Sequence, residues 1–192
     1  MKTVFFDVDT QIDFMYPAGA LYAPGAEHII PAVARLNRRA AETGAVVISS
    51  MDAHRENDPE FHQWPAHCVV DTVGQHKPAP TLLEKRLVIP PSEVAERIDG
   101  YQQMLLEKRR LDAFTSPNLT WILEALNADR YLVYGVVTEY CVKFAAFGLL
   151  KTGRRVEIVM DAIRSLSEED GKRILNDFTA AGGILTNITA LL

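Results

Sequence analysis

A strand that passes directly into a helix is the feature of this sequence that most restricts its fold. Residues 131–151, YLVYGVVTEYCVKFAAFGLLK, contain a short apolar run, a polar turn and an apolar segment of helical length that begins around Cys141. Such strand–helix units build parallel α/β folds. Amide groups at a helix start are unpaired and can stabilise a thiolate, so Cys141 is a candidate nucleophile. The alternative is a small buried apolar residue, a common role for a single cysteine.

The rest of the chain repeats this alternation of strands and helices. Apolar runs predict strands at Thr3–Val8, Ala45–Ser50, Gln103–Leu106, Val156–Met160 and Gly183–Leu185. Periodicity and capping residues predict helices at Ala26–Thr43, at Ser92–Arg97, after Ser116-Pro117 and after Ser167. The pattern predicts a three-layer α/β/α fold around a central, mainly parallel sheet. Residues 1–192 are expected to form a single domain, which at this size buries roughly 70% of its unfolded surface.

Composition excludes several classes of protein. The 48% hydrophobic and 23% charged content is that of a globular chain. A net charge of −5, spread along the sequence, argues against nucleic acid or an anionic membrane as a partner. The two cysteines offer no disulfide framework, and acids interrupt the first apolar run, unlike in a signal peptide. No run approaches the roughly 20 apolar residues of a membrane span. We therefore expect a soluble, cytoplasmic protein.

Polar side chains lie at the ends of four predicted strands. They are Asp9, the pair Asp52 and His54, Lys108, and the turn that leads to Cys141. Because the carboxyl ends of parallel strands meet at one edge of a sheet, we expect these groups to converge. A carboxylate, an ammonium and a thiol suit acyl transfer through a thioester, with backbone amides holding the oxyanion. Individually, Asp9 could equally cap a turn, and the KRR run that starts at Lys108 is typical of a solvated surface.

A second set of candidate ligands lies at the end of the second predicted strand and in the long segment without periodicity that follows it, Arg55–Pro80. Loops of this length in a compact domain are usually functional or disordered. Asp52 and His54 are two residues apart on an extended chain and therefore point the same way, and His67 can complete a metal site with open positions. Two other residues of the segment could also join this set: Asp58 and His62.

Three segments that carry these side chains match motifs of one family. D-T-Q-I-D-F from Asp9 is similar to D-x-Q-N-D-F, K-R-R-L-D-A-F from Lys108 to K-x-x-Y-S-A-F, and G-V-V-T-E-Y-C-V around Cys141 to G-x-x-T-[DE]-x-C-V. In these motifs the chain resembles the isochorismatase-like cysteine hydrolases, over nearly its whole length. The resemblance implies that Asp9, Lys108 and Cys141 are catalytic. It also implies a cis Val136–Val137 bond, with the amides of Val137 and Cys141 forming the oxyanion hole.

Two further motifs are similar to those of one subgroup of that family. D-A-H from Asp52 resembles D-x-H, and W-P-A-H-C from Trp64 resembles W-P-x-H-C, both found in nicotinamidases, also called pyrazinamidases. The resemblance implies a divalent metal, zinc first and iron or manganese as alternatives, held by Asp52, His54 and His67. It also implies that Phe14 and Trp64 are aromatic walls around a heteroaromatic ring, which such faces hold well.

The resemblance thus implies a metal-dependent amidase acting on a small amide, which converts nicotinamide and water to nicotinate and ammonia through a Cys141 thioester. It also implies self-association as a homo-oligomer. Ile12 and Leu111 replace the Asn and Tyr of the motifs, which suggests that the pocket suits a different amide. Two alternatives therefore remain. The first is another hydrolase of the family that acts on a different amide, a ureido compound or an isochorismate-like ether. The second is a non-catalytic binding protein with this fold.

Overall fold

A seven-stranded sheet forms the centre of the molecule, whose computed structural model describes residues 1–92 and 97–191. All of its strand pairs are parallel, as predicted. The strands are β1 (Thr3–Val8), β2 (Val46–Asp52), β3 (Arg86–Ile89), β4 (Gln103–Lys108), β5 (Arg130–Val136), β6 (Arg155–Arg164) and β7 (Ile184–Thr186), in the order β3-β4-β2-β1-β5-β6-β7. The helix predicted at Ser92–Arg97 falls largely on residues outside the described part of the chain.

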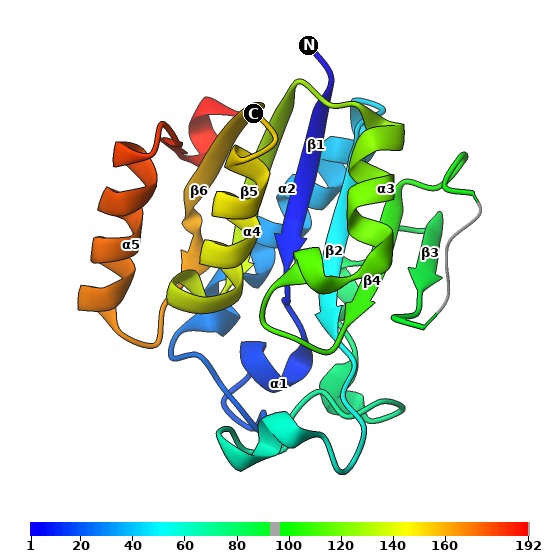
Figure 1. Ribbon diagram of the computed structural model, residues 1–192, viewed down its shortest axis with the longest axis vertical. Helices are drawn as coiled ribbons and strands as arrows, with labels where there is room; N and C mark the ends of the chain where they lie inside the picture. Colours follow the sequence, from blue (N-terminus) through cyan, green and yellow to red (C-terminus); the bar gives the residue numbers. More distant parts are fainter. Residues whose placement is uncertain (93–96, 192) are drawn as a thin grey trace.

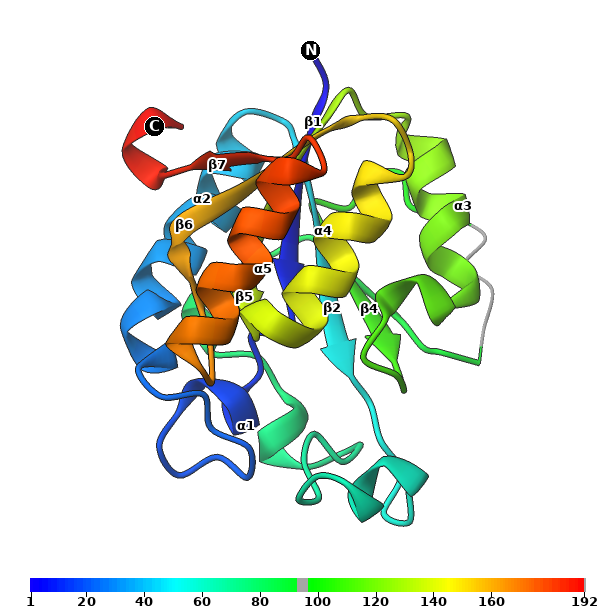
Figure 2. The ribbon, with the colours of Figure 1, turned by 60° about the vertical axis from the view of Figure 1, so that its left-hand side comes forward.

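Helices cover both faces of the sheet, which confirms the three-layer fold. They are α2 (Ile30–Glu42), α3 (Pro117–Leu126), α4 (Lys143–Leu150) and α5 (Glu168–Ala180), whereas the short helix α1 (Ile12–Met15) lies below the carboxyl edge of the sheet (Figure 1). Helices α3, α4 and α5 lie on one face and α2 on the other (Figures 1 and 2). The Ser116 and Ser167 side chains cap α3 and α5 as predicted, by accepting hydrogen bonds from the backbone N–H groups of Asn118 and Asp170.

Several boundaries differ from the sequence prediction, for local reasons. The helix predicted from Ala26 begins as a 3-10 turn, Ala26–Ile29, before α2. Strand β3 was not predicted, because its apolar run is only three residues long and it is an edge strand in which two of the four residues are exposed. Strand β6 continues past Met160 to Arg164, through polar residues and an irregularity in its pairing with β5.

Strands β2 and β4 each extend to the polar residue that was expected just beyond them. Asp52 and Lys108 are the last residues of these neighbouring strands and are direct partners in the strand register. Two side chains of opposite charge are therefore placed side by side at the carboxyl edge of the sheet. The backbone pairing of β2 with β4 thus brings together residues that are 56 positions apart in the sequence.

The segment from residue 53 to residue 82 lies below the carboxyl edge of the sheet, next to α1 (Figure 1). It contains three short 3-10 helices, Pro59–His62, Val73–Gln75 and Ala79–Thr81, and is thus an ordered part of the structure. One buried anchor of this segment is Lys77, whose ammonium group lies 2.9 Å from Asp7 Oδ2 and also contacts the Thr10 hydroxyl.

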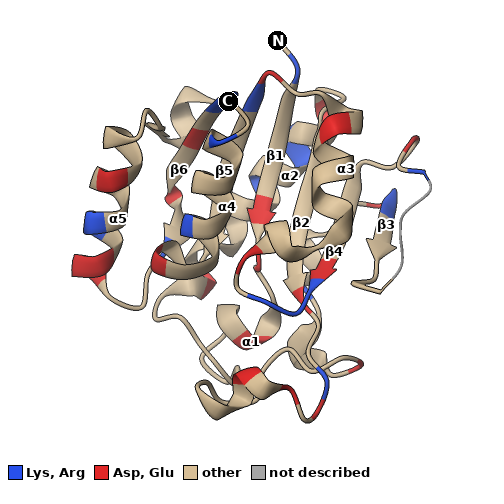
Figure 3. Ribbon diagram, in the orientation of Figure 1, with Lys and Arg blue, Asp and Glu red and all other residues tan. Residues whose placement is uncertain are grey.

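Acidic and basic residues are distributed over the helices, strands and loops (Figure 3). Within the described ranges, the structure contains no helix with the length and apolar character needed to cross a membrane.

Candidate active site

Asp9 lies directly after β1, at the start of the turn that leads into α1. The residue has a left-handed backbone conformation, with φ of 47°, and its side chain is buried. Its Oδ1 atom accepts a hydrogen bond of 2.6 Å from the Ser50 hydroxyl, and its Oδ2 atom lies 2.8 Å from the ammonium nitrogen of Lys108. The carboxylate is therefore held at the carboxyl edge of the sheet by contacts with β2 and β4.

Lys108 is buried at the centre of the site and is not part of a solvated basic surface. Its ammonium nitrogen lies 2.6 Å from Asp52 Oδ1, 2.8 Å from Asp9 Oδ2 and 3.9 Å from the sulfur of Cys141. Burial alone would lower the pKa of Lys108, but the carboxylates of Asp52 and Asp9 raise it well above the ordinary value. The group is therefore an ammonium ion that can stabilise negative charge on the sulfur.

Cys141 lies in a tight turn between β5 and α4. The peptide bond between Val136 and Val137 is cis, as the family resemblance implies, and a π-helical turn, Thr138–Val142, follows it. Gly135 precedes this turn with φ of 118°, and a Cβ atom there would lie 2.1 Å from the carbonyl oxygen of Val8. Only glycine therefore allows the end of β5 to approach β1 this closely.

The resting state of Cys141 differs from the expectation of a thiolate stabilised by the helix start. Burial raises the pKa of the Cys141 thiol; Lys108 lowers it, Asp9 and Asp52 raise it further, and the result is well above the ordinary value. The resting side chain is thus a neutral thiol. It requires a nearby base to remove its proton, and Asp9 is the carboxylate placed to do so.

The three candidate metal ligands, Asp52, His54 and His67, form one buried cluster. One ligand atom from each lies within 4.8 Å of the others. Asp52 Oδ2 is 4.0 Å from His54 Nε2 and 3.8 Å from His67 Nε2. His67 Nδ1 is 2.7 Å from the carbonyl oxygen of Pro65, which can only accept, so this nitrogen carries the proton and Nε2 is left free toward the cluster.

An unsatisfied atom tests whether these residues fit a metal ion. His54 Nε2 is buried and has no hydrogen-bond partner among the described residues, which is costly for a polar atom. Two imidazole nitrogens and a carboxylate oxygen are suitable ligands for zinc and related divalent ions. The cluster therefore fits a divalent metal ion.

Three more residues lie around this cluster. They are the two alternative ligands, Asp58 and His62, and one further acid, Glu60. Asp58 contacts His54 on the Nδ1 side, at 3.1 Å, and His62 is exposed at the surface. Glu60 has its Oε1 atom 3.9 Å from His54 Nε2 and lines the adjacent pocket. Burial and the charge of Asp52 raise the pKa of Glu60. In the sequence, only its position within the irregular segment could have pointed to Glu60. Acids are common in such loops, so this position is a weak signal.

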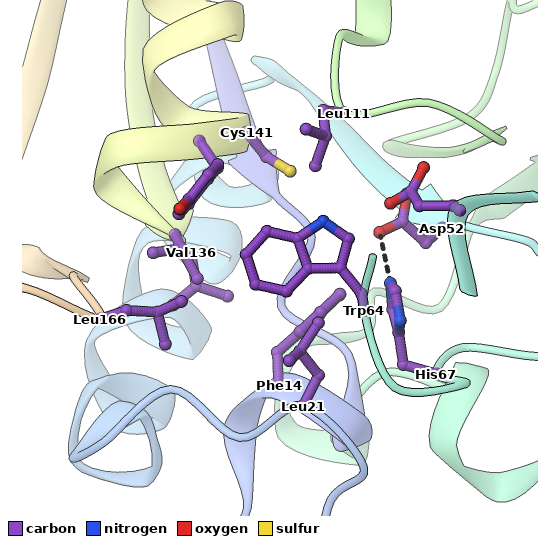
Figure 4. Close-up of a pocket in the computed structure, with 12 residues that line it drawn as sticks. Phe14, Leu21, Asp52, Trp64, His67, Leu111, Val136, Cys141 and Leu166 are labelled. Carbon is purple, nitrogen blue, oxygen red and sulfur yellow. Dashed lines mark ion pairs between the residues drawn. The ribbon is translucent and has the colours of Figure 1, made fainter. Parts of the chain in front are cut away.

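A pocket of about 410 Å³, measured out to its open mouth, connects the thiol and the metal cluster. Both predicted substrate-binding residues line it: Phe14, whose ring centroid is 5.3 Å from that of His67, and Trp64, which packs edge-on against Tyr140 at 5.3 Å. In the view of Figure 4, the Trp64 indole lies between Cys141 on one side and Asp52 with His67 on the other. The pocket walls also include residues not predicted as site residues: Leu21, Leu111, Val136, Tyr140 and Leu166.

The turn after β1 positions both halves of the site. The Gln11 side chain accepts a hydrogen bond from the Asp52 N–H at 2.7 Å and donates bonds of 2.8 Å to the carbonyl oxygens of Asp52 and Gln75. Asp13 accepts a 2.7 Å hydrogen bond from the N–H of Cys68, next to His67. The same short segment that presents Asp9 therefore also fixes the backbone of two candidate metal ligands.

Known proteins are similar to this chain in both sequence and structure. A family model described as the isochorismatase domain matches residues 3–190. The nicotinamidase of Escherichia coli (strain K12) is 27% identical over 202 residues, which cover 93% of this chain and 91% of that protein. A protein of Arabidopsis thaliana, called a probable inactive nicotinamidase, is 24% identical over 174 residues, covering 88% of this chain and 83% of that protein.

The solved structures include a similar protein with metal. The pyrazinamidase of Pyrococcus horikoshii in complex with zinc superposes with a TM-score of 0.81 at 28% sequence identity, covering 98% of this chain and 100% of that chain.

Proposed function

This chain belongs to the isochorismatase family, and we propose that it is a metal-dependent cysteine amidohydrolase that converts nicotinamide and water to nicotinate and ammonia. One observation carries the proposal: the buried group of Asp9, Lys108 and Cys141 adjoins the cluster of Asp52, His54 and His67 at a shared apolar pocket. The nicotinamidases and the pyrazinamidase among its relatives support the choice of substrate.

The reaction begins with transfer of the Cys141 proton to Asp9. Lys108, 3.9 Å from the sulfur, stabilises the thiolate, which attacks the carbonyl carbon of the amide. The amides of Val137 and Cys141 hold the oxyanion of the tetrahedral intermediate. When the intermediate collapses, the carbon–nitrogen bond breaks, and Asp9 returns the proton to the leaving ammonia. Asp9 then takes a proton from water, whose oxygen attacks the thioester. The carbon–sulfur bond breaks, the carboxylic acid leaves, and Asp9 returns the proton to the Cys141 sulfur.

The raised thiol pKa suits this sequence of steps. A neutral thiol reacts more slowly with unrelated electrophiles, because the thiolate is the nucleophilic form. Binding of the amide excludes water and places its carbonyl carbon beside the sulfur, so that proton transfer to Asp9 accompanies attack. The carboxylate that raises the thiol pKa at rest is thus also the base that deprotonates it.

Substrate orientation depends on the second half of the site. Asp52, His54 and His67 are the residues that would hold the divalent ion, for which zinc is our first choice. When bound, the ion supplies a Lewis-acidic position for the ring nitrogen of a pyridine. Phe14 and Trp64 supply the aromatic surfaces that a flat ring packs against.

The charge of the pocket argues against the other family substrates. Asp52 and Glu60 line it, and no Lys or Arg is found among the described residues that line it. Ureido acids and isochorismate-like ethers carry carboxylates, which Arg or Lys side chains usually bind. A neutral carboxamide needs no such side chain. The non-catalytic alternative does not explain why an acid, an ammonium and a thiol from three strands meet in one buried group.

The test is ammonia release from nicotinamide by protein loaded with zinc, iron or manganese and verified by elemental analysis. We expect turnover only with a metal bound. Absence of ammonia release from nicotinamide, together with turnover of a ureido acid, would replace the proposed substrate. Equal turnover with and without metal would show that the reaction does not depend on a metal.

The proposal also covers the cellular location and the oligomeric state of the enzyme. Both cysteines are free thiols, which suits a reducing, cytoplasmic environment. We also expect a homo-oligomer, which light scattering of the purified protein would test.

A further inference from the structure

Asp58 lies at the start of the 3-10 helix Pro59–His62 and faces the candidate metal ligand His54. Its Oδ1 atom accepts a 3.0 Å hydrogen bond from the N–H of Glu60, which caps the short helix. Its Oδ2 atom lies 3.1 Å from His54 Nδ1. From the same helix, the Phe61 ring packs edge-on against the His54 ring, with centroids 5.3 Å apart. One short segment therefore contacts His54 both through a carboxylate and through a ring.

The Nδ1 atom of His54 has few ways to be satisfied. The imidazole is fully buried, and neither ring nitrogen has an aligned hydrogen bond within the described part of the chain. A buried N–H group left without an acceptor destabilises the folded state. The Asp58 carboxylate, at 3.1 Å, is an acceptor within reach of Nδ1.

The Asp58 side chain places an acceptor at His54: its Oδ2 atom is 3.1 Å from Nδ1. A carboxylate is ordinarily an acceptor only at neutral pH. A carboxylate at Nδ1 favours the neutral imidazole tautomer with its proton on Nδ1.

The two nitrogens of His54 face different partners. Nδ1 faces Asp58, whereas Nε2 faces Asp52 Oδ2 at 4.0 Å and Glu60 Oε1 at 3.9 Å. The two ring nitrogens point in different directions. The Asp58 carboxylate contacts Nδ1 and therefore does not lie on the Nε2 side, where the candidate metal ligands meet. We propose that Asp58 is a positioning residue, which keeps the His54 proton on Nδ1 and thereby leaves the Nε2 lone pair free toward Asp52 and His67. This inference rests on the proposed metal-dependent function.

Variants of Asp58 can distinguish its role as a helix cap from its proposed role in positioning His54. Asp58→Ser keeps a side-chain oxygen that caps the Glu60 N–H but is too short to reach His54. Asp58→Asn keeps the shape and removes the charge. Glu56→Gln, at an exposed position of the same segment, is the matched control.

The first measurement is the tautomer of His54 in metal-free protein, by ¹⁵N NMR of labelled histidine at about pH 8, well above the ordinary imidazole pKa. We expect the Nδ1–H form in the native protein and in Glu56→Gln, and a shift toward the Nε2–H form in Asp58→Ser and Asp58→Asn. The same tautomer in all four proteins would overturn the proposal.

The second measurement is the zinc dissociation constant, by competition with a chromophoric chelator. We expect Asp58→Ser to bind zinc about 10- to 100-fold more weakly, the range typical for loss of such a partner. Unchanged zinc affinity in both Asp58 variants would overturn the positioning role. If the native protein binds no zinc, the metal-dependent function fails, while the tautomer still decides whether Asp58 orients His54.

Discussion

Lys108 Nζ lies 2.6 Å from Asp52 Oδ1, at the ends of two paired strands. The same ammonium group contacts Asp9 at 2.8 Å, so that one buried cation is shared by the proposed base and a proposed metal ligand. A buried carboxylate without such a partner would carry a large desolvation cost. The two halves of the candidate site are therefore electrostatically coupled, and a change in one is expected to affect the other.

Cys141→Ala is expected to abolish amide hydrolysis and leave the fold intact. Removal of the nucleophile from a catalytic group lowers turnover by about 10⁴- to 10⁶-fold. The measurement is ammonia release from nicotinamide, with circular dichroism as the check on folding. The matched control is Cys68→Ala, at the other buried cysteine, which should retain activity. Substantial turnover by Cys141→Ala would exclude the thioester mechanism.

Asp9→Asn is expected to stop turnover and yet make Cys141 more reactive toward iodoacetamide. Burial raises the thiol pKa, Lys108 lowers it and Asp9 raises it again, so loss of the Asp9 charge moves the thiol pKa downward. More thiolate is then present at about pH 7, and alkylation is faster. Mass spectrometry measures the rate, with Cys141→Ala as the background for Cys68 labelling. Slower alkylation of the variant than of the native protein would contradict this electrostatic account.

His67→Ala is expected to remove the metal, whereas His62→Ala is not. Both histidines lie in the irregular segment, but His67 is buried in the cluster and His62 is exposed. We expect at least a 10-fold loss of zinc affinity and of activity for the first variant and no change for the second. Dialysis of the native protein against a chelator should reproduce the loss, and added zinc should reverse it. Equal zinc affinity of the two variants would place the metal elsewhere.

Lys77→Met is expected to destabilise the fold by about 3–5 kcal/mol, because it leaves the fully buried carboxylate of Asp7 without its ammonium partner. Urea unfolding measures the loss. The double variant Asp7→Asn with Lys77→Met should recover most of it, since no unpaired charge remains. If the double variant is no more stable than Lys77→Met, the pair is not the source of the cost.

The parts of the fold that follow from local sequence were predicted well. Strand β1 was predicted with its observed bounds, and Ser116 and Ser167 were identified as helix caps. These features depend on an apolar run or on a hydroxyl beside a helix start, both of which are visible in a few neighbouring residues. Strand β3 and the extension of β6 to Arg164 were missed, because pairing with a neighbouring strand rather than local sequence stabilises them.

The residues of the candidate site were likewise predicted only in part. Strand ends and family motifs pointed to Asp9, Lys108, Cys141 and the three metal ligands as candidates. Glu60 was not predicted, and Asp58 was predicted only as an alternative ligand. Acids in a loop have no periodicity that would indicate their direction. Only the folded segment shows that Glu60 faces His54 Nε2 and that Asp58 faces Nδ1.

By itself, the sequence determined the parallel α/β architecture and the types of chemical group at the strand ends, because apolar periodicity and residue identity are local properties. The tertiary structure decided how those groups act on one another. Strand register placed Lys108 against Asp52, and burial raised the pKa of the Cys141 thiol, which the helix start was expected to lower. Register and burial arise from contacts between distant segments, and such contacts exist only after the chain has folded.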